Sequence, residues 1–124
     1  MSVREPHDWP TVFEKNLDAG DLEQIVSLYE PGAVFVSPSG ETLVGRDQIR
    51  QVLAGLIEKK ARFESHVVRA VTVADIAVLY ANFQGTVMEA PDKLAEVRSH
   101  AIDVLRRQSD GTGKLIVGDP NARG

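Results

Sequence analysis

The carboxyl group of Asp103 is the side chain whose setting best fits acid–base chemistry. It lies in the run 99–105, where the two-residue period of a β-strand places odd-numbered positions on one face and even-numbered positions on the other. On a face that looks into a pocket, lost hydration would raise the pKa of Asp103 and make it an acid, a base or a hydrogen-bond donor. On an outward face, the carboxylate would pair with Arg98, Arg106 or Arg107. The pattern leaves both orientations open.

His66 is a second candidate, because the unperturbed pKa of a histidine is about 6.5 and allows proton exchange near neutral pH. It begins an expected strand and could equally be a hydrogen-bonded wall residue. The other histidines, His7 and His100, are far from it in sequence, so the spacing predicts no metal site. The glycine-containing turn 111–113 is not followed by an expected helix, which argues against a phosphate loop and a nucleotide cofactor. We therefore expect neither a metal nor a cofactor.

Tyr80 and Asn82 share one face of another expected strand, residues 76–87. Polar residues at alternate positions either line a wet pocket or mark the solvent side of a sheet. Leu79, Ala81 and Phe83 occupy the opposite face. Periodicity alone does not decide which of the two faces is buried.

The composition is that of one globular domain over residues 1–124, with 43% hydrophobic and 26% charged residues. Fourteen basic and eighteen acidic residues give a net charge of −4, which argues against a nucleic-acid partner. The sequence has no cysteine, and it contains neither an apolar leader at its N-terminus nor a run of about 18 apolar residues. We expect a cytoplasmic protein with no membrane association.

These candidates must be positioned by helices that come first in the chain and by strands that follow. Apolar spacing and turn residues predict helices at about 9–18, 22–30 and 46–60, and a small hairpin of 33–37 and 41–44 around the turn Pro38–Gly40. Alternating β-branched and aromatic residues predict longer strands at 67–73, 76–87, 96–108 and 114–117, with a loop at 88–94. This order predicts an α+β fold in which a curved antiparallel sheet wraps around the N-terminal helices.

Several phrases in this order resemble a known superfamily: LDAGDL at 17–22, LYEPGAVF at 28–35, GRDQIR at 45–50 and LRRQSDG at 105–111. Over residues 9–120 the chain resembles nuclear-transport-factor-2-like proteins, and most of all their SnoaL-like and ketosteroid-isomerase-like branch. The resemblance implies a cone-shaped α+β barrel whose internal pocket binds a small apolar organic molecule, and it implies a homodimer. Members have many chemistries, so the function must be argued from the site.

The resemblance also assigns positions to the three groups of a ketosteroid isomerase: a tyrosine donor, a carboxylate base and a neutral aspartic acid. Phe13 stands at the tyrosine position and lacks a hydroxyl, and Ser37 stands at the base position, where a serine hydroxyl cannot take a proton from carbon. Asp103 aligns with the neutral aspartic acid. Steroid isomerisation by the family mechanism is therefore disfavoured, while the pocket is expected to remain.

We accordingly predict a small-molecule-binding protein. As an enzyme it would be a cofactor-free isomerase, cyclase, hydratase or hydrolase, with Asp103 and His66 as the catalytic residues. By resemblance, the expected ligand contacts are Trp9, Phe13, Tyr29, Ser37, Tyr80 and Asn82. The alternative is a non-catalytic ligand-binding or dimerisation module, whose self-contact surface would be the outer face carrying Leu79, Ala81 and Phe83.

Overall fold

The computed structural model describes residues 2–37 and 39–122, so Pro38 of the expected turn lies outside the described residues. The N-terminal part contains a short 3-10 helix (Pro6–Asp8), α1 (Trp9–Ala19), α2 (Leu22–Ser27), β1 (Tyr29–Val36), β2 (Thr42–Val44) and α3 (Arg46–Glu58). Four longer strands follow: β3 (Arg62–Val73), β4 (Ile76–Ala90), β5 (Lys93–Arg107) and β6 (Gly113–Asp119).

The junction between α1 and α2 is encoded by local residue preferences. Pro10 lies in the first turn of α1, where its missing N–H has no helical partner to lose. The helix ends at Gly20, whose φ of 69° is a left-handed conformation that glycine adopts without a Cβ clash. The side chain of Asp21 then accepts a hydrogen bond from the backbone N–H of Gln24 at 3.2 Å and caps α2. Two helices of different direction therefore meet within a few residues.

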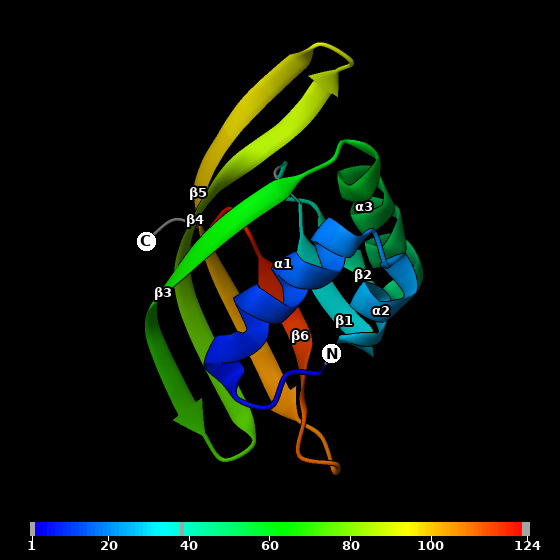
Figure 1. The fold of residues 1–124 in the computed structure, drawn as a ribbon. Coiled ribbons are helices and arrows are strands. Elements are labelled where there is room, and N and C mark those ends of the chain that lie inside the picture. Colours follow the sequence, from blue (N-terminus) through cyan, green and yellow to red (C-terminus); the bar gives the residue numbers. More distant parts are fainter. Residues whose placement is uncertain (1, 38, 123–124) are drawn as a thin grey trace.

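Within the described residues, six strands form one curved sheet in the order β2-β1-β6-β5-β4-β3. Figure 1 shows the three α-helices on one side of this sheet. All neighbouring strands are antiparallel except β1 and β6, which are parallel. The expected α+β layout is confirmed. The sheet is curved but not closed, so the barrel is open between its edge strands β2 and β3.

Several expected boundaries were wrong; for example, β3 begins at Arg62 and not at residue 67. The segment predicted as a loop at 88–94 continues as paired strand, with Met88 opposite Leu94 and Ala90 opposite Lys93. Only the turn at Pro91 and Asp92 interrupts it, and the resulting β4–β5 hairpin projects beyond the rest of the sheet (Figure 1). The second expected helix ends early, because Tyr29 already pairs with Leu115 of β6 and begins a strand.

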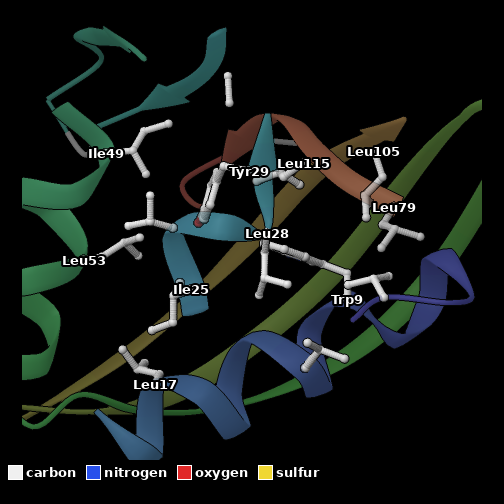
Figure 2. Close-up of a cluster of buried hydrophobic side chains, with 14 of the residues drawn as sticks. Trp9, Leu17, Ile25, Leu28, Tyr29, Ile49, Leu53, Leu79, Leu105 and Leu115 are labelled. Atoms are coloured by element: carbon white, nitrogen blue, oxygen red, sulfur yellow. The ribbon is translucent and has the colours of Figure 1, made fainter. Parts of the chain in front are cut away.

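The core lies between the helices and the inner face of the sheet (Figure 2). Its fully buried side chains include Leu17, Ile25 and Leu53 from the helices and Leu79 and Leu115 from the sheet. Burying one such side chain contributes about 1.5–3 kcal/mol, so this contact holds α1, α2 and α3 against the strands. In the described part of the chain, no helix combines the length and apolar character needed to cross a bilayer.

Candidate functional site

A cavity of about 280 Å³ lies between the helices and the inner face of the sheet. Side chains of α1 and α3 cover one side of it, and β3, β4, β5 and β6 provide the other. The sequence contains one tryptophan, two tyrosines and four phenylalanines, and all of them except Tyr80 line this cavity. The aromatic residues of the chain are thus concentrated around one internal space.

These rings contact one another in two groups. Trp9 packs edge-on against Tyr29, with ring centroids 5.5 Å apart, and it also contacts Phe13 at 5.7 Å. On the strand side, Phe63 of β3 and Phe83 of β4 are edge to face at 5.6 Å. Because such ring pairs fix each other's orientation, the cavity has a preformed apolar wall.

Asp103 lies at the sheet side of the cavity, on β5 opposite Leu79 of β4 and opposite Gly118 of β6. Burial raises its pKa from 3.8 to about 7, an interaction with the Trp9 side chain opposes this shift, and the charge of Asp119 adds to it. Within the described residues, no lysine, arginine or histidine forms an ion pair with it. The carboxyl group is therefore divided between its acid and base forms near neutral pH.

Tyr29 provides a hydroxyl group in the same cavity. The residue is 2% exposed, and burial together with the charge of Asp103 raises the pKa of its phenol well above the ordinary value. The side chain of Arg46 holds the strand start by donating two hydrogen bonds to the Tyr29 carbonyl oxygen, at 2.9 and 2.5 Å. Among the described residues the phenol hydroxyl has no hydrogen-bond partner, and it is not sealed off by protein atoms. It remains a protonated donor on a residue that lines the cavity.

Glu14 is a second carboxyl group in the cavity, and our sequence analysis missed it. It projects from α1 and accepts a hydrogen bond of 2.5 Å from the Ser65 hydroxyl on β3, 51 residues away. Burial raises its pKa, the hydrogen bond from Ser65 opposes this, and the charges of Asp18 and Glu64 add to the increase. A signal was present in the sequence: Pro10, Phe13, Glu14 and Leu17 follow the helical spacing of a buried face.

The structure brings five of the predicted site residues to this cavity: Trp9, Phe13, Tyr29, Ser37 and Asp103. They come from α1, from β1 and the residue after it, and from β5, so their convergence depends on the whole fold. Asn121, beyond the end of β6, also lines the cavity and had not been predicted. What these residues do there remains a prediction.

The structure does not bring His66, Tyr80 and Asn82 to the cavity. All three lie on the outer face of the sheet, where His66 is opposite Asn82 and the Asn82 side chain contacts His100 Nδ1 at 2.5 Å. The expected orientation of β4 was therefore wrong. Leu79 and Ala81 are 0% and 4% exposed and face the helices, because the apolar side of the strand is the side that the core can bury. The outer surface consequently does not carry Leu79, Ala81 and Phe83 as a self-contact face.

A shallower depression of about 1060 Å³ on the outer face includes His66, Asn82 and His100. In the part of the chain that the structure describes, no three histidine, aspartate or glutamate side chains gather as a metal site requires. The inner cavity is deeper than this depression and has aromatic walls and carboxyl groups with raised pKa values, so it is the candidate active site.

Comparison with known proteins places this geometry in a family. A model of the SnoaL-like domain matches residues 11–116. The chain belongs to the SnoaL-like family. No curated protein sequence matches it.

Solved structures show the same fold for this SnoaL-like domain. A Xanthomonas campestris protein named for a calcium/calmodulin-dependent protein kinase II association domain has a TM-score of 0.79 at 20% identity, over 94% of this chain and 84% of that one. A Streptomyces avermitilis protein of the NTF2-like family has a TM-score of 0.73 at 20% identity, over 92% and 91% of the two chains. A ketosteroid isomerase-like protein from Erwinia carotovora atroseptica has a TM-score of 0.73 at 18% identity, over 86% and 85%. At these identities the likeness concerns the fold alone.

Within this SnoaL-like domain, the three positions aligned with ketosteroid isomerases all line the cavity. Phe13 and Ser37 lack the proton-transfer groups of those positions, whereas Asp103 keeps a carboxyl group. Tyr29 adds a hydroxyl from β1, and Glu14 adds a second carboxyl from α1. The site therefore contains the groups needed for acid–base chemistry in a different arrangement.

Proposed function

We propose that this SnoaL-like domain binds a small, mostly apolar organic molecule in the inner cavity and that Asp103 transfers a proton on it without a cofactor. One observation carries the proposal: a half-buried carboxyl group without a cationic partner lies in the wall of an aromatic cavity, where desolvation raises its pKa to about 7. A group with this pKa accepts or donates a proton at neutral pH with little energetic penalty in either direction.

The size and lining of the cavity limit the ligand. Its volume of about 280 Å³ is at the lower end of ligand pockets, for which roughly 300–1,000 Å³ is typical. We therefore expect a compound of one or two rings. Aromatic side chains would contact its apolar part, and the Tyr29 hydroxyl would donate a hydrogen bond to a carbonyl or hydroxyl oxygen.

A carbonyl compound illustrates the chemistry that these groups support. The Asp103 carboxylate takes a proton from the carbon next to the carbonyl, so a C–H bond breaks and an O–H bond forms on Asp103. The electron pair moves to the carbonyl oxygen, and the Tyr29 hydroxyl stabilises the resulting enolate by hydrogen bonding. Return of the proton to the same or another carbon regenerates the carboxylate and completes an exchange or an isomerisation.

Ligand binding and proton exchange can be tested separately with bicyclic ketones such as 2-tetralone. Binding predicts a rise in melting temperature with ketone concentration, because a ligand at 100 times its Kd adds about 2.7 kcal/mol. Catalysis predicts faster deuterium incorporation from D₂O next to the carbonyl, measured by NMR, with wild type than with Asp103→Asn. Asp92→Asn, in the exposed β4–β5 turn, is the matched control and should behave as wild type.

The outcomes separate the two function classes. Stabilisation by ketones without exchange would support the non-catalytic binding module. Exchange that is equally fast in Asp103→Asn would remove Asp103 from the mechanism. No stabilisation by any ketone, alcohol or amine that fits the cavity would contradict the ligand-binding proposal itself.

The outer face of the sheet supports a proposal of homodimerisation. Val71 and Tyr80 are 38% and 39% exposed, and Val73 is 70% exposed, although all three are large apolar or aromatic residues. Exposed apolar groups that cluster on one face are typical of interaction surfaces. Sedimentation over a range of concentrations should show a dimer that Val71→Glu dissociates, and a monomeric wild type would contradict the proposal.

A further inference from the structure

The charges that line the inner cavity are all of one sign. Among its described lining residues, Glu14 and Asp103 are ionisable acids, and there is no lysine, arginine or histidine. Neither carboxyl group forms an ion pair elsewhere in the described chain. A partly buried carboxylate without a countercharge is unfavourable, so a cationic group entering the cavity would supply what the protein itself lacks.

Glu14 is the better placed of the two acids for a cation. Its hydrogen-bond donor Ser65 is opposite Phe83 in the β3–β4 ladder and two residues from Phe63, so the carboxyl group lies beside the Phe63–Phe83 ring pair. The faces of aromatic rings attract cations within about 6 Å. A positive group at this end of the cavity would therefore be stabilised by a carboxylate and by aromatic rings together.

The surroundings of Glu14 are also negative. Asp18 and Glu64 lie close enough to raise its pKa. The nearby cation Arg62 pairs with Asp18 at 3.4 Å, so it offsets part of the charge of Asp18 and leaves Glu14 without an ion-pair partner. This end of the cavity consequently favours cations and disfavours anions.

Tyr29 adds a polar group to the cavity that is separate from the two acids. The Tyr29 side chain is 2% exposed, and its hydroxyl has no protein partner among the described residues. No side-chain donor in the described residues is both buried and unpaired, so this hydroxyl is accessible and can donate to an oxygen of a ligand. The cavity thus has a hydrogen-bond donor, the Tyr29 hydroxyl, near Asp103 and an acceptor, the Glu14 carboxyl group, near Phe63.

We propose that the natural ligand carries a protonated amine, which pairs with Glu14 and lies against Phe63 and Phe83, while an oxygen of the ligand accepts from Tyr29. This inference rests on the proposed function, because it names the ligand class for the same cavity. Glu14 selects the ligand, and Asp103 remains free for proton transfer.

Three probes with one ring system and different charge test this assignment: 2-naphthylmethylamine, 2-naphthylmethanol and 2-naphthoate. Titration calorimetry on the full chain near pH 7 should show that the amine binds about tenfold or more tightly than the alcohol, and that the carboxylate binds weakest. Glu14→Gln keeps an oxygen that accepts from Ser65 and should reduce the amine affinity to that of the alcohol. Glu96→Gln, an exposed acid on β5 that does not line the cavity, is the matched control and should retain the preference.

Each failure has a distinct meaning. Equal affinities for amine and alcohol would overturn the amine assignment and leave the ligand cavity intact. An amine preference that persists in Glu14→Gln and disappears in Asp103→Asn would remove Glu14 from this role. The absence of binding by all three probes would overturn the proposed function itself, and the unliganded melting temperature of each variant shows whether it is folded.

Discussion

Replacement of Asp103 by asparagine should stabilise the protein at high pH while it removes the proposed catalytic group. The pKa of Asp103 is raised from 3.8 to about 7 in the folded protein, mainly by burial. Between these two values, the folded state holds one more proton on this residue than the unfolded state. The contribution of Asp103 to stability is therefore fully present below pH 3.8 and is lost as the pH rises through about 7.

The size of this change in unfolding free energy follows from the pKa shift of Asp103. One pKa unit corresponds to 1.36 kcal/mol, so a rise of about three units costs roughly 4 kcal/mol once the group is ionised. Natural domains are stable by about 5–15 kcal/mol, which makes this a large part of the total. Asp103→Asn should match wild type only below about pH 3.8, where the residue is protonated in both states. At pH 5 the unfolded carboxyl group is already ionised, so the variant should be more stable by about 1.6 kcal/mol. At pH 8.5 it should be more stable by up to about 4 kcal/mol.

Urea unfolding at pH 5, 6, 7 and 8.5 measures the difference between wild type and Asp103→Asn. Trp9 is the single tryptophan of the chain and is 4% exposed, so its fluorescence reports the transition at the cavity. The pKa of Glu14 is also raised, but its contribution is common to both proteins and cancels in the comparison. Asp92→Asn should show no such pH dependence. A difference between Asp103→Asn and wild type that is the same at all four pH values would refute the proposed burial of this carboxyl group.

Two further substitutions test the cavity and the sheet around it. Ala81 lines the cavity and is 4% exposed, so the larger side chain of Ala81→Leu should fill part of the space. This variant should lose its stabilisation by 2-tetralone in a thermal melt, while its unfolding free energy should change by less than about 2 kcal/mol. Unchanged stabilisation by the ketone would place the ligand elsewhere. Gly85 has no room for a side chain, because an added Cβ would lie 2.0 Å from the Arg62 carbonyl oxygen and 2.7 Å from a Phe63 ring carbon. Gly85→Ala should therefore cost at least about 1–3 kcal/mol in urea unfolding, whereas Gly55→Ala, with nothing within 4 Å of the new Cβ, should not.

The order and class of the elements could be predicted because local residue preferences encode them. Gly20 and Asp21 encode the junction between α1 and α2, and the β-rich half after Ala61 encodes the long strands. The start of β1 could not be predicted in this way. Ile25, Leu28 and Tyr29 have helical spacing, but Tyr29 pairs with Leu115 across the parallel β1–β6 contact, and a pairing over such a distance has no local signal.

The faces of the strands explain why only part of the site was predicted. In β5 both faces carry apolar residues, so periodicity could not show that Asp103 points inward; the pairing with Leu79 decides it. In β4 the polar residues were interpreted as pocket lining, although a cavity enclosed by rings needs the apolar face of Leu79 and Ala81. Family resemblance placed Phe13 and Ser37 at site positions. It gave no position to Glu14, whose carboxyl group is held by a hydrogen bond from Ser65, 51 residues away.

The same desolvation that would suit Asp103 to proton transfer also lowers the stability of the fold once the carboxyl group is ionised. A basic residue beside the carboxyl group would restore its normal pKa and recover much of the roughly 4 kcal/mol, but it would leave a permanent carboxylate that no longer exchanges protons near pH 7. No such residue lines the described cavity, while the exposed acid Glu23 is paired with Arg50. A purely structural module would gain stability from an apolar residue at position 103. The presence of an acid without a cationic partner beside Tyr29 and Trp9 is the physical basis for the proposal that position 103 acts on a ligand.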